Sequence, residues 1–422
     1  MGLLSEKEVT VFFDQVIEGY EAMTTMSDKA DLLTVDMATQ QNSSDVIWRP
    51  ESMYGRIVNG LDVSGVSGDV IELAVPAPLD TIDNDKFDLT ALELRDKRFM
   101  ERRAKAAAML LSTNLNVNVA NLVANTGTLV VERAAPPSSY EDIAACETRM
   151  DALEIPISDS RSMFLETQTY GRISAALANK DRTPLVESAI RSSKFGDFAS
   201  FETFRTNFQP VLPASSNPTV TISGAGQFHV PTPTETSPGG VVVPLDNRGM
   251  NLDVSTSVGI AVGDAFTIPN VFEVSGISKL TTSNLRTFRV TSIVDSTTIG
   301  IYPRIVPVDQ IGSGLTASEG TYANVDITPV DTSTIVWINL SATKINSFWR
   351  NDSVGITAGK IAWDADMFAG ATFKRSTASN GVEIVMAIEG TAMSGVVEIR
   401  ITDFYGIVNL DPQQNGIMAD FT

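Results

Sequence analysis

Apolar residues recur at helical spacing near the start of the chain. Between residues 5 and 23 they lie three or four positions apart, the period of an amphipathic helix: Val9, Phe12, Val16, Tyr20 and Met23. Asp14, Glu18 and Glu21 line a different face of this predicted helix. The pattern fits a helix that packs on its own domain and leaves an acidic face in water. It also fits an arm that docks a basic partner helix, and both interpretations stay open.

The segment 90–127 contains no proline, and its single glycine is its last residue. Thr90 with Glu93 three positions later forms a predicted capping box, and Gly127 is placed as a left-handed helix stop. We therefore expect a helix of about 35 residues, roughly 50 Å long at 1.5 Å per residue. Its apolar stripe is Ala104, Ala108, Leu111, Leu115 and Leu122.

Basic residues crowd the first half of this long helix. They are Lys97, Arg98, Arg102, Arg103 and Lys105. A solvated face paired with nearby acids explains such a cluster. An electrostatic contact between subunits is the alternative.

Between these two helices, residues 47–79 alternate like two strands around a Gly/Ser-rich middle, which predicts a long hairpin. The hairpin has too few large apolar residues for a core of its own, so we expect it to lie on another surface, such as a neighbouring subunit. Residues 128–212 then mix short helices and strands. The predicted helices are "SSYEDIAACETRMDAL", "TYGRISAALANK" and "LVESAIRSSKF", and the predicted strand is "SMFLET".

From about residue 214 to 328 the helical period disappears, and short strands follow at barrel-like spacing. Within this stretch, 231–249 is a long loop rich in Pro and Gly. It is too long for a simple strand connection, and it carries Asp246 and Arg248, one charge of each sign. Helical and mixed sequence is expected to return in "DTSTIVWINLSATKINSFWRND", followed by strands. The chain therefore reads as an α+β fold with an inserted all-β module.

Composition narrows the range of functions. Lys plus Arg total 31 against 51 Asp plus Glu, a formal charge of −20 over 422 residues. This balance argues against a surface built to grip nucleic acid, which must be basic. The N-terminus does not read as a secretion signal, and no apolar run is long enough for a membrane span.

The chain offers few catalytic groups. It has one cysteine, Cys146, and one histidine, His229, so a Cys/His zinc site cannot form within one chain. His229 lies beside a Pro/Thr-rich loop and is placed at a surface or barrel edge. Asp83 with Asp85, and Asp364 with Asp366, could touch a divalent cation, although acids two apart are more often turn or cap residues. We expect no enzyme, no cofactor and no metal.

Several stretches together resemble the major coat proteins of short-tailed double-stranded DNA phages, of the Salmonella-phage type with an inserted I-domain on the Hong Kong 97-like capsid fold. The similarity is strongest over "IWRP" and "DNDKFDLTALELRDKRFMERRAKAAAMLLSTNLNVNVANLVANTGTLVV". "TYANV", "FWRND…DMFAG" and "SGVVEIRITDFYGI" continue it in the same order along the chain.

The resemblance implies an assignment for each segment. The long helix corresponds to the spine helix, and residues 47–80 to the E-loop hairpin. The implied parts are the N-terminal arm (1–46), the E-loop (47–80), a peripheral domain with the spine helix (81–130), the first part of the axial domain (131–213), the I-domain (214–328) with its D-loop near 231–249, and the second part of the axial domain with the return to the peripheral domain (329–422).

The resemblance also implies a function and partners. The chain would self-assemble, with scaffolding and portal proteins, into hexamers and pentamers of an icosahedral shell around double-stranded DNA. It would do so in the bacterial host cytoplasm, without a membrane and without sequence-specific DNA binding. Asp14, Glu18 and Glu21 would dock scaffolding protein. Asp246, Arg248, Lys97, Arg98 and Arg102 would make contacts between subunits.

Three other functions compete with this one. An encapsulin-like shell around an enzyme cargo would keep the fold but change the class. A carbohydrate-binding or tail-type β-protein is suggested by residues 214–328 alone, and the long helix counts against it. An enzyme built on Asp364 and Asp366 is the last.

Overall fold

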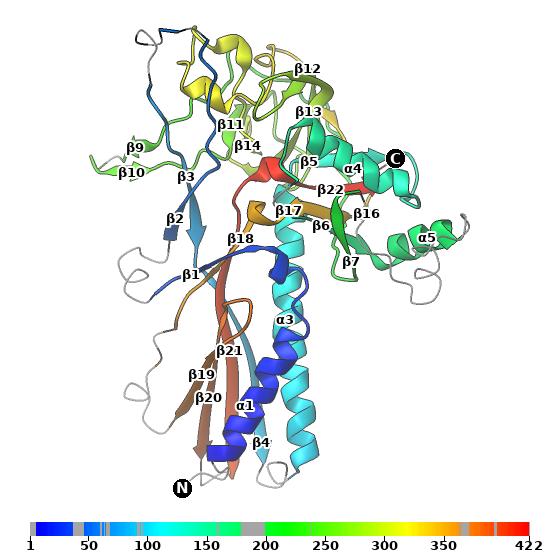
Figure 1. Ribbon diagram of the computed structural model, residues 1–422, viewed down its shortest axis with the longest axis vertical. Helices are drawn as coiled ribbons and strands as arrows, with labels where there is room; N and C mark the ends of the chain where they lie inside the picture. Colours follow the sequence, from blue (N-terminus) through cyan, green and yellow to red (C-terminus); the bar gives the residue numbers. More distant parts are fainter. Residues whose placement is uncertain are drawn as a thin grey trace. The chain divides into compact units, whose positions relative to one another are not determined.

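The computed structural model describes residues 6–36, 46–59, 61–62, 64, 68–90, 93, 96–157, 160–178, 199–237, 239–361, 363, 371–391 and 395–421. The chain divides into two compact units (Figure 1). The first contains Met1–Ile47, Pro76–Val119 and Gly355–Val408. The second contains Trp48–Val75, Ala120–Val354 and Asn409–Thr422.

A six-stranded sheet forms the frame of the first unit. Its order is β1-β18-β21-β20-β19, and β4 pairs with β21. The strands are β1 (Asp31–Thr34), β4 (Thr81–Thr90), β18 (Val354–Ala358), β19 (Thr372–Thr377), β20 (Glu383–Thr391) and β21 (Val396–Asn409). A short 3-10 helix, η1 (Ser27–Lys29), precedes β1. Burial alternates along β21 between Val396 and Ile401, as expected for a sheet with one face turned to a core.

Helices α1 (Glu6–Glu21) and α3 (Lys97–Thr126) pack in this unit against β4. The Phe12 ring of α1 lies 6.3 Å from the Phe87 ring of β4. Four residues of the predicted α3 stripe, Ala104, Ala108, Leu111 and Leu115, are at most 2% exposed. The amphipathic helix and the stripe are therefore confirmed, with Leu122 only partly buried.

The predicted start of the long helix needs correction, whereas its end before Gly127 is confirmed. The helix has 30 residues and begins at Lys97, because Thr90 is the last residue of strand β4. The N-cap is Asp96, whose carboxylate accepts the N–H groups of Arg98 and Phe99 at 3.0 and 3.3 Å. Thr90 does bond to the Glu93 carboxylate, at 2.9 Å from its N–H, but outside the helix.

Gly127 ends α3 for a different reason from the one expected. Its φ is not positive. A Cβ there would lie 2.7 Å from the Val123 carbonyl oxygen and 3.1 Å from the Gly416 Cα, so close packing demands the glycine.

The second unit has a mixed five-stranded sheet of order β5-β22-β17-β6-β7. Its strands are β5 (Leu129–Arg133), β6 (Arg161–Glu166), β7 (Phe201–Thr206), β17 (Asn346–Arg350) and β22 (Asn415–Asp420). Helices α4 (Tyr140–Ala152) and α5 (Thr167–Ala178) contribute to its apolar core. A capping box between Ser139 and Asp142 starts α4. The predicted helix "LVESAIRSSKF" lies outside the described residues.

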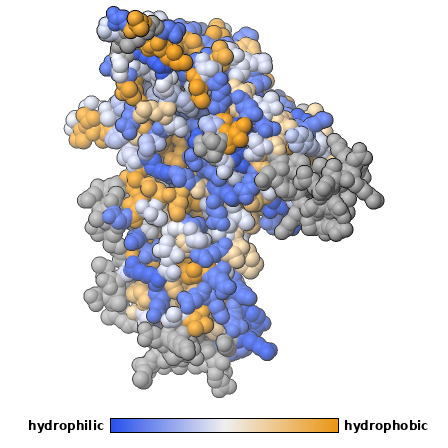
Figure 2. Space-filling view, in the orientation of Figure 1, coloured by the Kyte–Doolittle hydropathy of each residue, from blue (hydrophilic) through white to orange (hydrophobic). Residues whose placement is uncertain are grey.

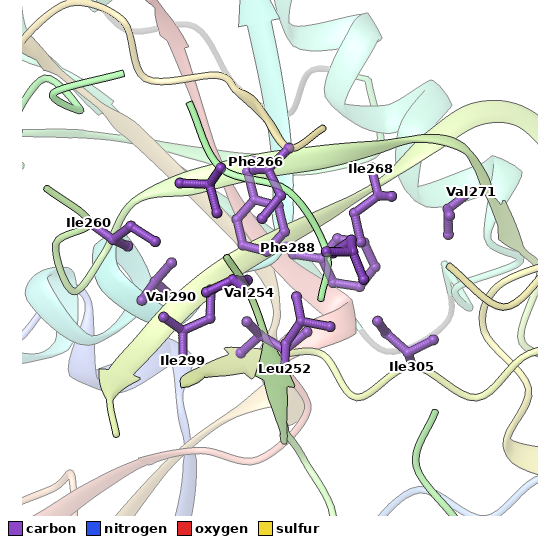
Figure 3. Packing of buried hydrophobic residues seen from close by; sticks show 14 of the residues in the cluster. Leu252, Val254, Ile260, Phe266, Ile268, Val271, Phe288, Val290, Ile299 and Ile305 are labelled. Carbon is purple, nitrogen blue, oxygen red and sulfur yellow. The ribbon is translucent and has the colours of Figure 1, made fainter. Parts of the chain in front are cut away.

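A β-barrel completes this unit. An antiparallel sheet runs in the order β11-β14-β13-β12-β15. Its strands are β11 (Met250–Asp253), β12 (Ala265–Val274), β13 (Thr281–Ile293), β14 (Thr298–Tyr302) and β15 (Val336–Trp337). Residues 220–222 hydrogen-bond on one side to 253–255 and on the other to 333–335, which closes the sheet on itself. The interior is apolar, with the Phe266 and Phe288 rings stacked 5.5 Å apart (Figure 3).

The barrel is inserted through a narrow neck. β8 (Val211–Leu212) enters it and β16 (Thr343–Lys344) leaves it, and the two strands pair with each other. Because β15 belongs to the barrel sheet, the insertion continues past the boundary expected at residue 328. The helical reading of "DTSTIVWINLSATKINSFWRND" is wrong: the segment forms β15, β16, β17 and a 3-10 turn, η5 (Asn351–Ser353), as its β-branched and aromatic residues favour.

Two short hairpins lie outside the larger sheets. β2 (Val46–Pro50) pairs with β3 (Ala74–Pro78) at the base of the segment expected to be the E-loop. β9 (Thr234–Thr236) pairs with β10 (Val242–Pro244) inside the loop 231–249. The residues that the structure describes also form the 3-10 turns η3 (Val308–Gln310), η4 (Glu319–Tyr322) and η6 (Pro412–Gln414). No helix among the described residues is long and apolar enough to cross a bilayer.

Candidate functional site

The side chains that could have supported catalysis are buried or make structural contacts instead. The His229 Nε2 lies 2.8 Å from the Asn247 Oδ1, and burial holds the pKa of His229 below its usual value. Cys146 is fully buried in α4, and burial raises the pKa of its thiol. Within the described residues, no group of three or more His, Cys, Asp or Glu side chains is arranged to hold a metal ion. Asp364 and Asp366 lie outside those residues.

Asp83 and Asp85 serve the packing of α3 on β4. The Asp83 carboxylate accepts the Asn114 amide at 2.5 Å. The Asp85 carboxylate pairs with Arg103 at 2.7 Å, and the Arg103 guanidinium lies 4.0 Å above the Phe87 ring. Both acids therefore bind side chains of the long helix. For Arg103, this agrees with the interpretation that the basic cluster pairs with nearby acids of the same chain.

The exposed surfaces are better candidates for function than these buried groups. The first is helix α1, which packs on α3 through one of its faces. Gly19 of α1 faces α3 so closely that a Cβ would lie 2.9 Å from the Ala108 Cβ. Beyond the helix, the Asn116 side chain of α3 accepts the Met26 N–H at 3.1 Å and donates to the Met23 carbonyl at 3.0 Å. This arrangement fixes the apolar face of α1 on its own unit.

The opposite face of α1 carries the predicted acidic residues. Asp14 and Glu18, one turn apart, have exposed side chains. Glu21 is also exposed, but its Oε1 accepts the Ser379 N–H at 2.7 Å and so binds the loop between β19 and β20. The structure thus leaves two carboxylates pointing to solvent and uses the third to hold the helix.

The predicted basic contacts lie at the first turns of α3. Arg98 and Arg102 are exposed, and the Arg102 Nε donates to the Arg98 carbonyl at 3.3 Å. Lys97 is the first residue of the helix, and its side chain is outside what the structure describes. An inter-subunit contact requires exposed side chains, and a face that only meets solvent would have them too. The exposure of Arg98 and Arg102 therefore fits both interpretations.

In the loop 231–249, Asp246 and Arg248 pair with each other. Arg248 Nη2 lies 2.7 Å from the Asp246 Oδ2, and Arg248 Nη1 donates to the Asn409 carbonyl at 2.6 Å. The Arg248 side chain is only 11% exposed, so the two charges form the base of the loop in the single chain. The tip instead exposes Val241 and Val242, more than 60% each. Figure 2 shows hydrophobic surface over the β9–β10 hairpin.

The segment 47–79 is similarly apolar at its far end. Ile57 is 92% exposed and Leu61 is fully exposed. Its base is held by residues that sequence reasoning did not identify. Glu51 pairs with Arg304 at 2.7 Å, and the Tyr322 hydroxyl donates to the Ile71 carbonyl at 2.6 Å. Burial by itself would lower the pKa of Arg304, but the Glu51 carboxylate reverses this and keeps it above its usual value.

A second buried arginine joins the barrel to the end of the long helix. Arg289 of β13 donates to the Ala124 carbonyl in the last turn of α3, where carbonyl groups lack helical partners. Thr287 donates to the Thr128 carbonyl just beyond. Burial lowers the pKa of Arg289 to about 9. Single arginines in a strand pattern carry no signal for such a role, because the partner is a backbone group distant in sequence.

The comparisons with known proteins begin with a family model. A family described as "P22 coat protein - gene protein 5" matches residues 1–419. The CUS-3 coat protein I-domain is 36% identical, covering 29% of this chain and 98% of its own, with a TM-score of 0.23. The cyanophage P-SCSP1u capsid is 9% identical over 94% of this chain and 88% of its own, with a TM-score of 0.46. Mycobacterium phage Che8 gives 9% identity, 94% and 90% coverage and a TM-score of 0.43.

Proposed function

Because the chain belongs to the P22 coat protein family, it is a major capsid protein that forms the icosahedral shell of a bacteriophage, and we propose that each exposed surface described above makes one contact of that shell. The family match across residues 1–419 is the observation that carries this conclusion. Affinity in such a shell comes from many modest contacts repeated by symmetry.

Hexamers and pentamers of the chain assemble with a scaffolding protein and a portal protein in the bacterial cytoplasm. The arm helix α1 receives a basic helical segment of the scaffolding protein. Asp14 and Glu18 support this role because they are exposed on one face while the opposite face is fixed to α3. Glu21 contributes less, since its carboxylate already binds the Ser379 N–H.

The two hairpins make the contacts between subunits. The 47–79 hairpin lies on a neighbouring subunit through apolar side chains such as Ile57, which single-chain folding leaves in water. The 231–249 loop reaches a neighbouring capsomer through Val241 and Val242 rather than through Arg248, which is occupied at the base. Arg98 and Arg102 add an electrostatic contact beside the start of the spine helix.

The shell encloses double-stranded DNA without binding it specifically. A formal charge of −20 opposes adhesion of DNA to the wall, because phosphates are attracted to basic surfaces. The chain acts as a structural protein and not as an enzyme.

Electron microscopy of particles purified from cells that express the chain with its phage partners tests this function. A bacteriophage shell has a unique portal vertex and packages DNA. A closed shell filled with an enzyme cargo and lacking a portal would instead favour the encapsulin-like alternative, and a protein that forms no particles would exclude both.

A further inference from the structure

A buried carboxyl group on strand β21 of the first unit makes no well-formed hydrogen bond. Asp403 of β21 is completely buried, and neither of its carboxylate oxygens has a hydrogen-bond partner. Its cross-strand neighbour in the β4–β21 register is Asp83, a second carboxyl group. The Tyr20 hydroxyl of α1 is also buried without a partner in this region.

The surroundings of Asp403 supply negative charge and no compensating cation. Asp83 is already bound by the Asn114 amide and by the Tyr405 hydroxyl, which donates to it at 2.7 Å. No cationic side chain among the described residues contributes to the shift of the pKa of Asp403. The titratable groups of this region are Asp83 on β4, Tyr405 on β21, Tyr20 on α1 and, beside Tyr20, Asp28 on η1.

An ionised carboxylate in such a place is unfavourable. A buried carboxylate without a cation beside it loses more hydration energy than nearby N–H groups return, so the group binds a proton instead. Burial first, and the charge of Asp83 second, hold the pKa of Asp403 well above its usual range, and the nearby N–H groups of Asp83 and Asp403 offset only part of this.

The helix α1 packs over this position. Tyr20 is completely buried, and the negative charges of Asp403 and Asp83 act on it. The next residue, Glu21, binds the Ser379 N–H beside Asn380, whose side chain faces the Tyr20 hydroxyl. An ionised Asp403 would therefore lie beneath the last turn of α1.

We propose that Asp403 holds a proton in the folded subunit and that this proton makes the docking of helix α1 pH-dependent, firmer in acid and looser in base. The proposal rests on the packing of the first unit and requires no scaffolding protein. It gives the arm a conformational control that lies inside the subunit.

Denaturant unfolding of the full-length, unassembled chain between pH 5.5 and 8.5 tests the proton. In this range an unfolded Asp is ionised, since its pKa is about 3.9. A folded state that keeps the proton thus loses stability as pH rises, by about tenfold in the folding constant per pH unit until Asp403 ionises. Asp403→Asn keeps the shape without titrating, so the ratio of its folding constant to that of the wild type should rise with this slope.

Asp88→Asn is the matched control, because it removes an exposed carboxyl group from β4, the strand that pairs with β21. Its ratio to the wild type should not change with pH in this way. A constant ratio for Asp403→Asn across the range would overturn the proposal. The proposal would also be overturned if added NaCl or MgCl₂ stabilised the wild type but not Asp403→Asn. A cation and not a proton would then occupy the site.

Hydrogen exchange tests the link to the helix. After correction for the intrinsic effect of pH on exchange rates, amides in 6–21 should lose protection as pH rises in the wild type but not in Asp403→Asn. The barrel amides should respond alike in both proteins. Equal behaviour of α1 in the two proteins contradicts the coupling.

If the variant does not fold, infrared spectroscopy of the wild type tests the proton. The folded chain at pH 7 should show a protonated carboxyl band that disappears on unfolding. Absence of that band contradicts the proposal.

Discussion

At the scale of single residues, Gly19 controls how closely α1 approaches α3. A Cβ at this position would lie 2.9 Å from the Ala108 Cβ, closer than packed side chains allow. Gly19→Ala should therefore cost about 1–3 kcal/mol of unfolding free energy through overpacking. Gly171→Ala in α5 is the control: nothing lies within 4 Å of its added Cβ, so it should gain up to about 1 kcal/mol from helix propensity. Adding Ala108→Gly should relieve the Gly19→Ala clash, and equal effects of the two alanine variants in denaturant unfolding would refute the close contact.

The arginines at the start of α3 should separate assembly from folding. Arg98→Ala with Arg102→Ala should change the unfolding free energy by no more than about 0.5 kcal/mol per site, since both side chains are exposed. Light scattering should nevertheless show slow or misdirected assembly if they contact a neighbour. Arg103→Ala is the contrasting variant, because it leaves Asp85 buried and unpaired, which costs about 1–3 kcal/mol. A double variant that assembles normally would make Arg98 and Arg102 an ordinary solvated face.

Residue patterns predicted the buried stripe of α3 better than its start. Ala104, Ala108 and Leu111 follow directly from a 3.6-residue period. Thr90 and Glu93 do interact, but they do not cap the helix. Thr90 ends strand β4, and a local sequence motif does not reveal that this strand pairs with β21. The Glu51–Arg304 pair joins residues 253 positions apart, so no sequence spacing could indicate it.

At the scale of elements, the acidic face of α1 should recruit scaffolding protein. Asp14→Lys with Glu18→Lys should abolish recruitment, measured by co-sedimentation with assembling shells, while each single change only weakens it, since exposed ion pairs contribute about 0–1 kcal/mol each. Asp88→Lys with Glu389→Lys makes the same charge change on exposed strand positions and should bind normally. Binding that survives the α1 double change and is insensitive to salt would exclude this role.

The 231–249 loop can be shortened without disturbing its base. Asn247 is completely buried and bonds to Thr232 through both atoms of its amide, at 3.1 and 2.8 Å. Deleting 233–244 keeps this closure and removes the exposed valines, so the subunit should unfold at an unchanged denaturant concentration. Assembly should then give tubes, aberrant shells or no particles. Normal closed heads would show that the loop does not bridge capsomers.

The elements themselves were predictable where one face of each is buried. The barrel strands were predicted from short strand-like segments at barrel-like spacing. The closure by residues 220–222 and 333–335 was not, since it depends on pairing between the two ends of the insertion. The "WINLSATKINSFW" stretch was misread because some of its apolar residues, Ile338, Ala342, Ile345 and Trp349, fall at helical spacing. β17 lies in the middle of a sheet with Asn346–Trp349 buried, yet Asn346 and Ser347 are polar, so the sequence does not reveal this burial.

At the scale of the whole molecule, the sequence carried the family and the order of its parts, because the resemblance extends over most of the chain and the family match over residues 1–419. It could not carry the contacts between subunits. Asp246 and Arg248 show why: two complementary charges near each other in sequence satisfy each other in the single chain, whereas the exposed Val241 and Val242 carry no charge pattern that would identify a partner.

The most direct test of the account is a cryo-EM map of the particles that the full-length chain forms with its scaffolding protein. The account predicts a closed icosahedral shell in which the tip of each 231–249 loop touches a subunit of another capsomer and each 47–79 hairpin lies on its neighbour. A closed shell in which both hairpins project freely into solvent, or a chain that stays monomeric under assembly conditions, would contradict it.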